Sequence, residues 1–320
     1  MKADVAIVIV SYNSEEHIGE CLESIFNQRS QISQQVIVVD NDSRDGTVEL
    51  VRRRFPEVEL VEPRRNLGFA KGVNLGANHA DAEFILLLNP DTVILNHAVD
   101  TVVAFAKERP GHGLYGGRTF QPDGSLEPSS CWGEPTLFSM ALFAFGLTTL
   151  FPRNRWLDPE SLGDWQRDSI REVGVVTGCF LLAPKLVWEE LGGLDESYFM
   201  YGEDVDLAMR ARRAGYRPVI CPFAELVHEG GKSSETPVHK ILLLYRGKAS
   251  LVRSHWTGFS QIFGLFLLLA GTWLRAMAGT AASWVRRSEA AGRWQTLWEK
   301  RGEWLQGYGS TGEDSAKTEV

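Results

Sequence analysis

The chain has 320 residues, of which 44% are hydrophobic and 23% charged, and it contains 31 Gly and 13 Pro. This composition is that of a folded globular protein and excludes collagen-like, disulfide-scaffold and wholly disordered chains. The length predicts two domains, or one large α/β domain with an appendage. Because Cys21, Cys131, Cys179 and Cys221 occur singly, neither a zinc ribbon nor a disulfide framework is indicated, and a reducing cytoplasm is expected.

The formal net charge of −8 argues against a general nucleic-acid binder, so no nucleic-acid partner is expected. The charge is uneven, because no Asp or Glu occurs from Thr236 to Ser288. The basic residues of that stretch are Lys240, Arg246, Lys248, Arg253, Arg275, Arg286 and Arg287. We therefore predict an acidic body with a basic, apolar C-terminal arm. The apolar run near the N-terminus is too short for a signal peptide, so no export signal is expected.

Strands and helices alternate over the first ninety residues. Val5–Val10 is a continuous apolar run, typical of a strand buried on both faces, and Glu15–Phe26 has the apolar spacing of a one-faced helix. The alternation continues with strands at Val36–Val39, Val58–Val61 and Phe84–Leu88 and helices at Thr47–Arg54 and Gly68–His79. This order predicts right-handed βαβ units and an α/β fold with a doubly wound, mostly parallel sheet and flanking helices.

The pattern weakens after Phe105, and Tyr115–Trp165 is predicted to be a long irregular stretch that could form an acceptor wall. Order returns in a strand over Val173–Leu182, interrupted at Thr177 and Gly178. The remaining predicted elements are a helix over Glu203–Ala214 that ends at Gly215, a short strand at Val219–Cys221 and a segment at Ala224–His228.

Polar side chains gather where the predicted parallel strands end. Ser11, Tyr12 and Asn13 follow the first strand, Asp40 ends the second, and Asn89-Pro90-Asp91 follows Leu88. Ligands of open α/β sheets bind outside the carboxyl ends of the strands. The sequence therefore predicts one polar cleft at this edge of the sheet.

Two carboxylates in this cleft carry alternative interpretations. Asp40 could accept a hydrogen bond from a nucleobase or ribose, or Asp40 and Asp42 could form an Asx-turn and cap the helix that begins at Thr47. Asp91 could ligate Mg²⁺ or Mn²⁺ together with substrate phosphates, or it could stand in an ordinary turn.

Three later residues are also candidates for chemistry. Glu203 and Asp204 begin a helix, where they could cap it or supply a general base for an acceptor hydroxyl. We expect the helix dipole to keep Asp204 ionised and therefore a weak base. His228 follows the final strand and could be a metal ligand or a structural histidine.

Five motifs occur in a specific order: Val8–Asn13, Val38–Thr47, Asn66–Asn74, Leu87–Asp91 and Gly192–Leu207. Together they resemble glycosyltransferase family 2, and specifically its rhamnosyltransferase-like branch. The resemblance covers about Val5 to Ser233. It implies a GT-A fold and an inverting transfer of a sugar from a nucleotide donor to an acceptor hydroxyl, with Mg²⁺ or Mn²⁺ at the diphosphate.

The resemblance also implies roles for single residues. Asp40 matches the nucleoside-binding Asp, Asp91 the metal-binding Asp of the D-x-D motif, Asp204 the catalytic base and His228 a metal-ligating His. The full set expected to bind the donor is Ser11, Tyr12, Asn13, Asp40, Asn66, Gly68, Asn74 and Asn89. Thr177, Gly178 and Glu203 are expected near the acceptor.

One position departs from the family pattern, because Asn89 stands where the D-x-D motif begins. Asn-Pro-Asp resembles the form of the rhamnosyltransferase-like branch, which favours dTDP-rhamnose as donor. A UDP- or GDP-sugar remains open, as does a non-catalytic membrane-bound scaffold with a degenerate pocket.

The domain prediction places a glycosyltransferase domain at 1–235, with a donor half of about 1–110 and an acceptor half of about 111–235. A helical membrane-associating arm follows at 236–305 and a disordered tail at 306–320. Trp256–Leu274 is uncharged and would span about 28 Å as a helix, barely the hydrocarbon thickness.

Basic residues on both sides of this segment favour in-plane or re-entrant attachment to the inner face of the cytoplasmic membrane over a single span. Arg286–Leu305 is predicted to be an interfacial helix with Trp294, Leu297, Trp298 and Leu305 on one face. Packing on the catalytic domain or in a homodimer is the alternative. Membrane attachment would suit a lipid-linked or polysaccharide acceptor in cell-surface glycan synthesis.

Overall fold

The computed structural model describes residues 2–229, 237–283 and 289–309. Arg286, Arg287 and most of the predicted tail lie outside these residues. The described chain forms two compact units. The first contains 2–132, 166–199 and 203–229, and the second contains 133–165, 200–202, 237–283 and 289–309. The predicted donor and acceptor halves stay a prediction, although 133–165 group here with the C-terminal helices.

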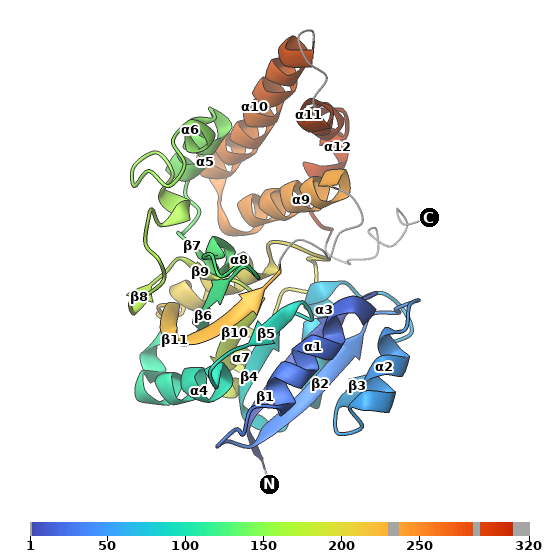
Figure 1. The fold of residues 1–320 in the computed structure, drawn as a ribbon. Coiled ribbons are helices and arrows are strands. Elements are labelled where there is room, and N and C mark those ends of the chain that lie inside the picture. The colour runs from blue at the N-terminus through green and yellow to red at the C-terminus, as the bar shows by residue number, and fades with distance from the viewer. Residues whose placement is uncertain (1, 230–236, 284–288, 310–320) are drawn as a thin grey trace. The chain divides into compact units, whose positions relative to one another are not determined.

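The first unit is an α/β sheet with helices (Figure 1). In its N-terminal part, the elements are β1 (Ala3–Ser11), α1 (Glu15–Phe26), β2 (Gln34–Asp40), α2 (Thr47–Arg54), β3 (Glu59–Val61), α3 (Phe69–His79), β4 (Ala82–Leu88), β5 (Thr92–Ile94) and α4 (Ala98–Glu108). There follow η1 (Pro110–His112), β6 (Tyr115–Phe120), η2 (Pro128–Ser130), β7 (Cys131–Trp132), β8 (Arg171–Glu172), β9 (Val175–Val176), β10 (Phe180–Pro184), α7 (Lys185–Leu191), α8 (Glu203–Arg213) and β11 (Val219–His228).

The main sheet has the strand order β3-β2-β1-β4-β10-β6-β11-β5, with β8 beside β11. Strands β1 to β4 are parallel, β10 runs antiparallel to both β4 and β6, and β11 is parallel to β6 and antiparallel to β5. The predicted α/β class with a mostly parallel sheet and flanking helices is confirmed. The parallel strands all end at one edge, which brings their terminal polar residues together.

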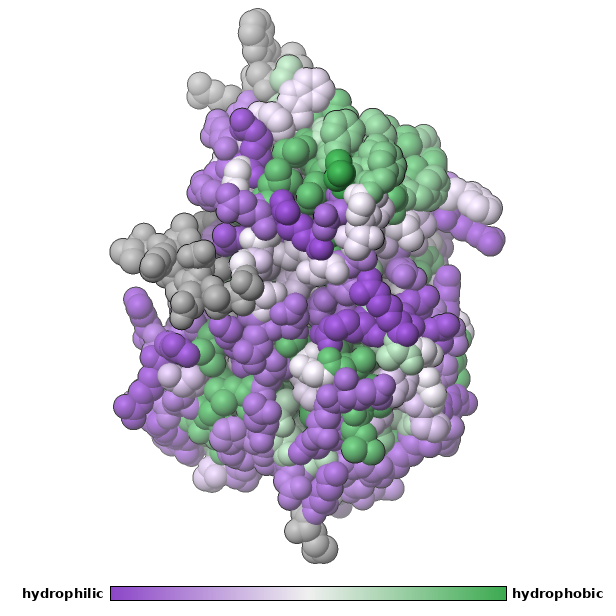
Figure 2. Space-filling model, turned by 180° about the vertical axis from the view of Figure 1, so that it is seen from behind, coloured by the Kyte–Doolittle hydropathy of each residue, from purple (hydrophilic) through white to green (hydrophobic). Residues whose placement is uncertain are grey.

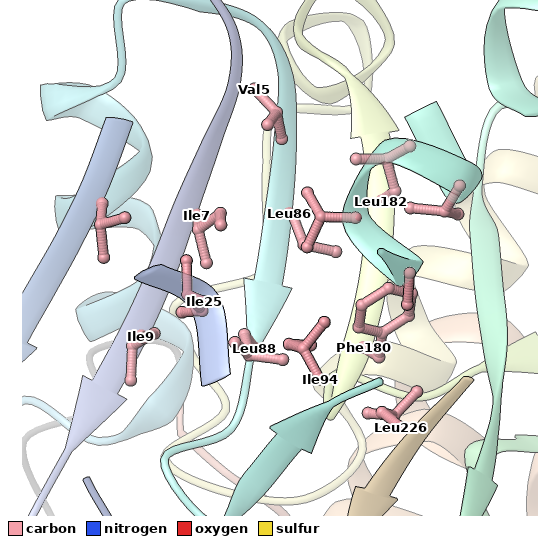
Figure 3. Close-up of a cluster of buried hydrophobic side chains, with 14 of the residues drawn as sticks. Val5, Ile7, Ile9, Ile25, Leu86, Leu88, Ile94, Phe180, Leu182 and Leu226 are labelled. Carbon is pink, nitrogen blue, oxygen red and sulfur yellow. The ribbon is translucent and has the colours of Figure 1, made fainter. Parts of the chain in front are cut away.

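The core explains the long apolar runs. Ile7 and Ile9 of β1 are fully buried, and Ile7 pairs with Val36 on one side and Leu86 on the other. Figure 3 shows these strands' side chains meeting Ile25 of α1. Burial on both faces removes the alternation of polar and apolar residues that marks half-exposed strands.

The prediction for Tyr115–Trp165 is wrong at its beginning, because β6 lies inside the main sheet. The two glycines of β6 lowered its apolar signal. A Cβ on Gly117 would come within 2.5 Å of the Ala224 carbonyl oxygen, so close strand packing excludes a side chain there. Val219–His228 is likewise one strand instead of two segments, with a register shift between Ile220 and Glu225.

The second unit is helical. Its elements are α5 (Leu137–Ala144), α6 (Leu147–Leu150), η3 (Pro159–Ser161), α9 (Pro237–His255), α10 (Gly258–Ser283), α11 (Glu289–Glu299) and α12 (Arg301–Trp304). Its core surrounds Tyr245, whose ring lies 5.1 Å from that of Trp304. Over the described residues, one helical segment, Gly258–Ala278, is long and apolar enough to cross a membrane.

Two predictions about the arm need correction. Leu297 is buried in the core of the second unit, and Trp294 and Leu305 pack against that core, so much of the predicted interfacial face is covered by protein. The predicted disordered tail is ordered at its start, because the amide of Tyr308 donates to Ser250 Oγ at 2.7 Å. Residues 310–320 lie outside the described chain.

Candidate active site

The loops after β1 and β2 are joined by hydrogen bonds. Ser11 Oγ donates to Asp40 Oδ1 at 3.3 Å, and the Ser43 amide donates to Asp40 Oδ2 at 2.9 Å. The Asn13 amide donates to Ser43 Oγ at 2.9 Å. Asp40 is buried, and each carboxylate oxygen retains a second lone pair. Asp40 therefore organises this turn, and its carboxylate can still accept a further hydrogen bond.

Neither Asp40 nor Asp42 caps α2, because its N-cap residue is Gly46 and no side chain caps the helix. Asp45 Oδ1 accepts from the Thr47 amide at 3.1 Å and from Thr47 Oγ1 at 2.6 Å. The structural alternative for Asp40 and Asp42 is thus confirmed in its turn at Asp40 and wrong in its helix cap, and the nucleoside contact of Asp40 stays a prediction.

The loop before α3 is fixed by Gly68. Asn66 Oδ1 accepts from the Gly68 amide at 2.9 Å, and Asn41 Nδ2 donates to the Gly68 carbonyl at 3.0 Å. Gly68 has φ of +77°, and a Cβ would meet the Phe199 carbonyl oxygen at 2.5 Å. Only glycine suits this conformation and this close approach. The loop therefore brings the start of α3 against the segment that leads towards α8.

Asn74 binds the same segment from α3. Its Nδ2 donates to the Leu194 carbonyl at 2.8 Å, and its Oδ1 accepts from the Leu194 amide at 3.0 Å. Glu196 Oε1 accepts from Nδ2 at 3.2 Å. The structure thus gives Asn74 a positioning contact, and its predicted donor contact stays a prediction.

Asn89, Asp91 and His228 come together where β4 ends and β5 pairs with β11. His228 Nε2 lies 3.4 Å from Asp91 Oδ1 and 3.4 Å from Asn89 Nδ2. Thr92, next to Asp91, is directly opposite His228 in the strand pairing. Burial favours a higher pKa for Asp91, but neighbouring His228 outweighs this and holds that pKa below 3.8.

This group fits a divalent cation in its donor types. Asp91 Oδ1 and His228 Nδ1 are buried without a hydrogen-bond partner among the described residues. Within the same part of the chain, no cluster of three or more His, Cys, Asp or Glu side chains could hold a metal. The protein therefore offers two ligands, and a cation there would need further oxygens from a substrate.

Asp204 and Glu203 lie at the N-terminus of α8. The Gly178 amide donates to Asp204 Oδ2 at 3.4 Å, and the Val205 amide donates to Asp204 Oδ1 at 2.8 Å. Next to Gly178, the Cys179 carbonyl accepts from the Asn89 amide at 3.1 Å. The backbone just before β10 thus links Asp204 to the strand end that carries Asn89.

The electrostatics of this pair differ from the expectation. Burial raises the pKa of Asp204 despite the backbone hydrogen bonds that lower it. Burial and then the charge of Asp204 raise the pKa of Glu203 to about 8. The prediction of a weak base therefore needs correction, because desolvation outweighs the helix terminus. Glu203 Oε2 has no hydrogen-bond partner in the described chain.

Other predicted residues have structural contacts. Thr177 Oγ1 donates to the Ser129 carbonyl at 3.0 Å, and the Tyr12 amide donates to Ser14 Oγ at 3.3 Å. Sequence reasoning missed His17 and Glu229, whose Nδ1 and Oε2 lie 3.5 Å apart beside the Asp91 group. No local pattern marks His17, which is a half-buried residue of the one-faced helix α1.

Comparison with known proteins agrees with this geometry. Residues 6–165 match the family model "Glycosyl transferase family 2". The chain is 32% identical over 239 residues to the N-acetylglucosaminyl-diphospho-decaprenol L-rhamnosyltransferase of Mycobacterium tuberculosis, with 71% of this chain and 76% of that protein covered. This chain belongs to glycosyltransferase family 2. Rhamnosyltransferase WbbL of Escherichia coli is 24% identical over 237 residues, with 70% and 83% covered.

Solved structures confirm the fold expected of this glycosyltransferase. A mannosyltransferase from Pyrobaculum calidifontis, solved with GDP-Man and Mn²⁺, superposes with a TM-score of 0.54 at 19% identity, covering 99% of this chain and 87% of that one. Residues 1–349 of Staphylococcus aureus TarS, solved with UDP-GlcNAc, give a TM-score of 0.52 at 16% identity, covering 99% and 84%. The GT-A-like arrangement is thus confirmed.

Proposed function

We propose that this family 2 glycosyltransferase transfers rhamnose from dTDP-rhamnose to a hydroxyl of a lipid-linked or polysaccharide glycan in cell-surface polysaccharide synthesis. The observation that carries the proposal is the 32% identity to the mycobacterial rhamnosyltransferase over 239 residues. The Escherichia coli rhamnosyltransferase supports the same sugar. The name of the mycobacterial relative also supports a lipid-diphosphate acceptor.

In this proposal, the donor nucleoside binds at the ends of β1 and β2. Asp40 accepts a hydrogen bond from the base or ribose with the lone pairs that Ser11 and Ser43 leave free. Tyr12, Asn13 and Asn66 flank that position. Thymine and uracil present the same N3–H and carbonyl edge, so the donor test must include UDP- and GDP-sugars.

Asp91 and His228 would hold Mg²⁺ or Mn²⁺, with Asn89 beside them. When bound, the cation stabilises negative charge on the departing diphosphate. His228 approaches Asp91 Oδ1 through Nε2 at 3.4 Å, so a nitrogen and an oxygen donor lie side by side, which supports this role. The lowered pKa of Asp91 keeps its carboxylate ionised at neutral pH.

Asp204 is the proposed general base. It takes the proton of the acceptor hydroxyl while that oxygen bonds to the anomeric carbon and the bond to the diphosphate breaks, which inverts the configuration. Its buried carboxylate is held by the Gly178 and Val205 amides, and its raised pKa brings it closer to the pH at which a general base works best. Thr177, Gly178 and Glu203 border the proposed acceptor position.

The test is an assay of nucleoside diphosphate release by the purified full chain. The donors are dTDP-rhamnose, UDP-N-acetylglucosamine and GDP-mannose, each with and without Mn²⁺, and the acceptor is an N-acetylglucosaminyl-diphospho-polyprenol. Acceptor-dependent dTDP release that needs metal and disappears in Asp204→Asn supports the proposal. Turnover of another donor would reassign the sugar. No turnover and no nucleotide binding by folded protein would favour the non-catalytic scaffold.

A further inference from the structure

Helix α10 exposes an apolar stripe. Leu274 is exposed to its side, and the stripe itself consists of Phe259, Ile262, Phe266, Trp273 and Met277, of which the first two are 77% and 70% exposed. The spacings of three, four, seven and four residues place them on one face of the helix. The ring of Phe263 stacks between those of Phe259 and Phe266. An unbroken aromatic and aliphatic face of this length is unusual for a surface in water.

The opposite face of α10 is already covered by protein. Leu267, Leu268 and Thr272 are buried, and a Cβ on Gly271 would meet Ala144 Cα of α5 at 2.8 Å. A lone membrane-spanning helix would contact lipid all round, whereas α10 packs through this face against α5, α9 and α11. The packing therefore fits a helix that lies along a surface.

Arg275 fixes α5 beside α10. Its Nη1 donates to the Ala144 carbonyl at 3.2 Å, and its guanidinium lies 4.4 Å from the centre of the Phe143 ring. On α5 and in the chain that follows it, further large apolar side chains are exposed, at Phe138, Phe145, Leu150, Phe151 and Trp156. Figure 2 shows hydrophobic side chains gathered over the helical second unit.

The charged residues between Phe151 and Trp156 are positive. Arg153 and Arg155 are exposed between Phe151 and Trp156, and the Arg155 guanidinium lies 5.3 Å from the centre of the Trp156 ring. The sequence from Thr236 to Ser288, which includes α10, contains no Asp or Glu. Aromatic and basic residues together suit the boundary between acyl chains and anionic headgroups.

We propose that this surface, made of the α10 stripe with Phe138, Phe145, Leu150, Phe151 and Trp156, binds an anionic phospholipid bilayer with α10 lying in the membrane plane. The stripe from Phe259 to Met277 extends about 27 Å along the helix and inserts side chains to the depth of the acyl boundary. The proposal concerns attachment and stands apart from the proposed chemistry. It would hold the enzyme at the leaflet where a lipid-linked acceptor is presented.

The test is flotation of the full chain with vesicles of phosphatidylcholine, with and without phosphatidylglycerol, in the absence of donor. We expect binding that rises with phosphatidylglycerol and is released by carbonate at high pH, because α10 would lie in the membrane plane. Ile262→Glu and Phe266→Glu should each lower the bound fraction about tenfold. Leu186→Glu is the matched control, since Leu186 is 79% exposed on α7 of the other unit and its variant should bind as the wild type does.

Three results would overturn the proposal: no vesicle binding by the wild type, unchanged binding by both stripe variants, or resistance to carbonate. If the same variants instead dissociate a dimer in light scattering while vesicles never bind, the surface belongs to a second copy of the chain. Thermal shifts with dTDP and Mn²⁺ on each variant keep this outcome separate from the donor site, because the stripe variants should retain the wild-type response.

Discussion

His228 Nε2 lies 3.4 Å from Asp91 Oδ1, although the two residues are far apart in the sequence. The antiparallel pairing of β5 with β11 places Thr92, the neighbour of Asp91, opposite His228. The pair is therefore assembled by sheet topology and depends on the last strand of the unit. This relationship makes two variants informative.

Asp91→Asn keeps the side-chain shape and removes the charge. We expect it to weaken Mn²⁺-dependent dTDP binding by about 100-fold, because an amide oxygen is a poorer cation ligand than a carboxylate. Titration calorimetry with dTDP, with and without Mn²⁺, measures the effect. Metal-dependent binding equal to that of the wild type would contradict the assignment.

His228→Gln should reduce the same metal-dependent binding by about 10- to 100-fold. His79→Gln is the matched control, because His79 is also paired with a carboxylate, that of Glu59, but lies on the surface. The control should bind dTDP and Mn²⁺ as the wild type does. An equal loss in both variants would point to a general effect on the fold.

Asp204→Asn should lower kcat about 100- to 10,000-fold while the dissociation constant for dTDP stays the same, because a general base acts on the acceptor and leaves donor binding alone. Single-turnover kinetics and nucleotide titration separate the two quantities. Asp123→Asn, in an exposed turn, serves as the control. A variant that retains half or more of the wild-type rate would exclude Asp204 as the base.

Glu203→Gln should change the pH dependence of stability. The folded pKa of Glu203 is about 8 against 4.5 for the free side chain, so the folded state holds a proton that the unfolded state releases. Stability from this group therefore falls as pH rises from 4.5 to 8. Glutamine does not ionise, so the variant does not lose stability in this way as the pH rises. The Tm of the variant should therefore rise relative to that of the wild type towards pH 8, by about 2 °C or more. Calorimetry from pH 5 to pH 8 measures it, and a constant difference would refute the assignment.

Gly68→Ala should destabilise the first unit by about 2–4 kcal/mol, because a side chain at φ of +77° would also collide with the Phe199 carbonyl. Gly192→Ala is the comparison, since Gly192 has φ of +76° with no atom within 4 Å of the added Cβ. Gly192→Ala should lower the free energy of unfolding by only about 1 kcal/mol. Equal losses in urea unfolding would show that the close approach to Phe199 contributes nothing.

The sequence predicts the parallel half of the sheet well, because β1, β2 and β4 are buried on both faces and read as unbroken apolar runs. It predicts β6 poorly, because Gly116 and Gly117 are dictated by neighbours distant in the chain, Val176 and Ala224. Such requirements arise only after strand order is fixed. The periodicity of apolar residues within one segment therefore gives no sign of these packing requirements.

The same division holds for the candidate site. Asp40 and Asp91 follow apolar strands, so their place at the strand ends can be read from the sequence. The contact between Asp91 and His228 requires the pairing of β5 with β11, and the raised pKa of Asp204 requires burial that no local pattern reveals. Roles that depend on one turn were therefore predictable, whereas those that depend on desolvation were not.

The cysteines and the tryptophans report on different units of the molecule. Cys21, Cys131, Cys179 and Cys221 are all buried in the first unit, and burial raises the thiol pKa of Cys21 and Cys179 to about 12. Seven of the ten tryptophans lie in the described residues of the second unit. The rate of reaction with a thiol reagent therefore reports unfolding of the first unit, whereas tryptophan emission reports mainly unfolding of the second unit. Whether the two unfold together can be read from one unmodified sample.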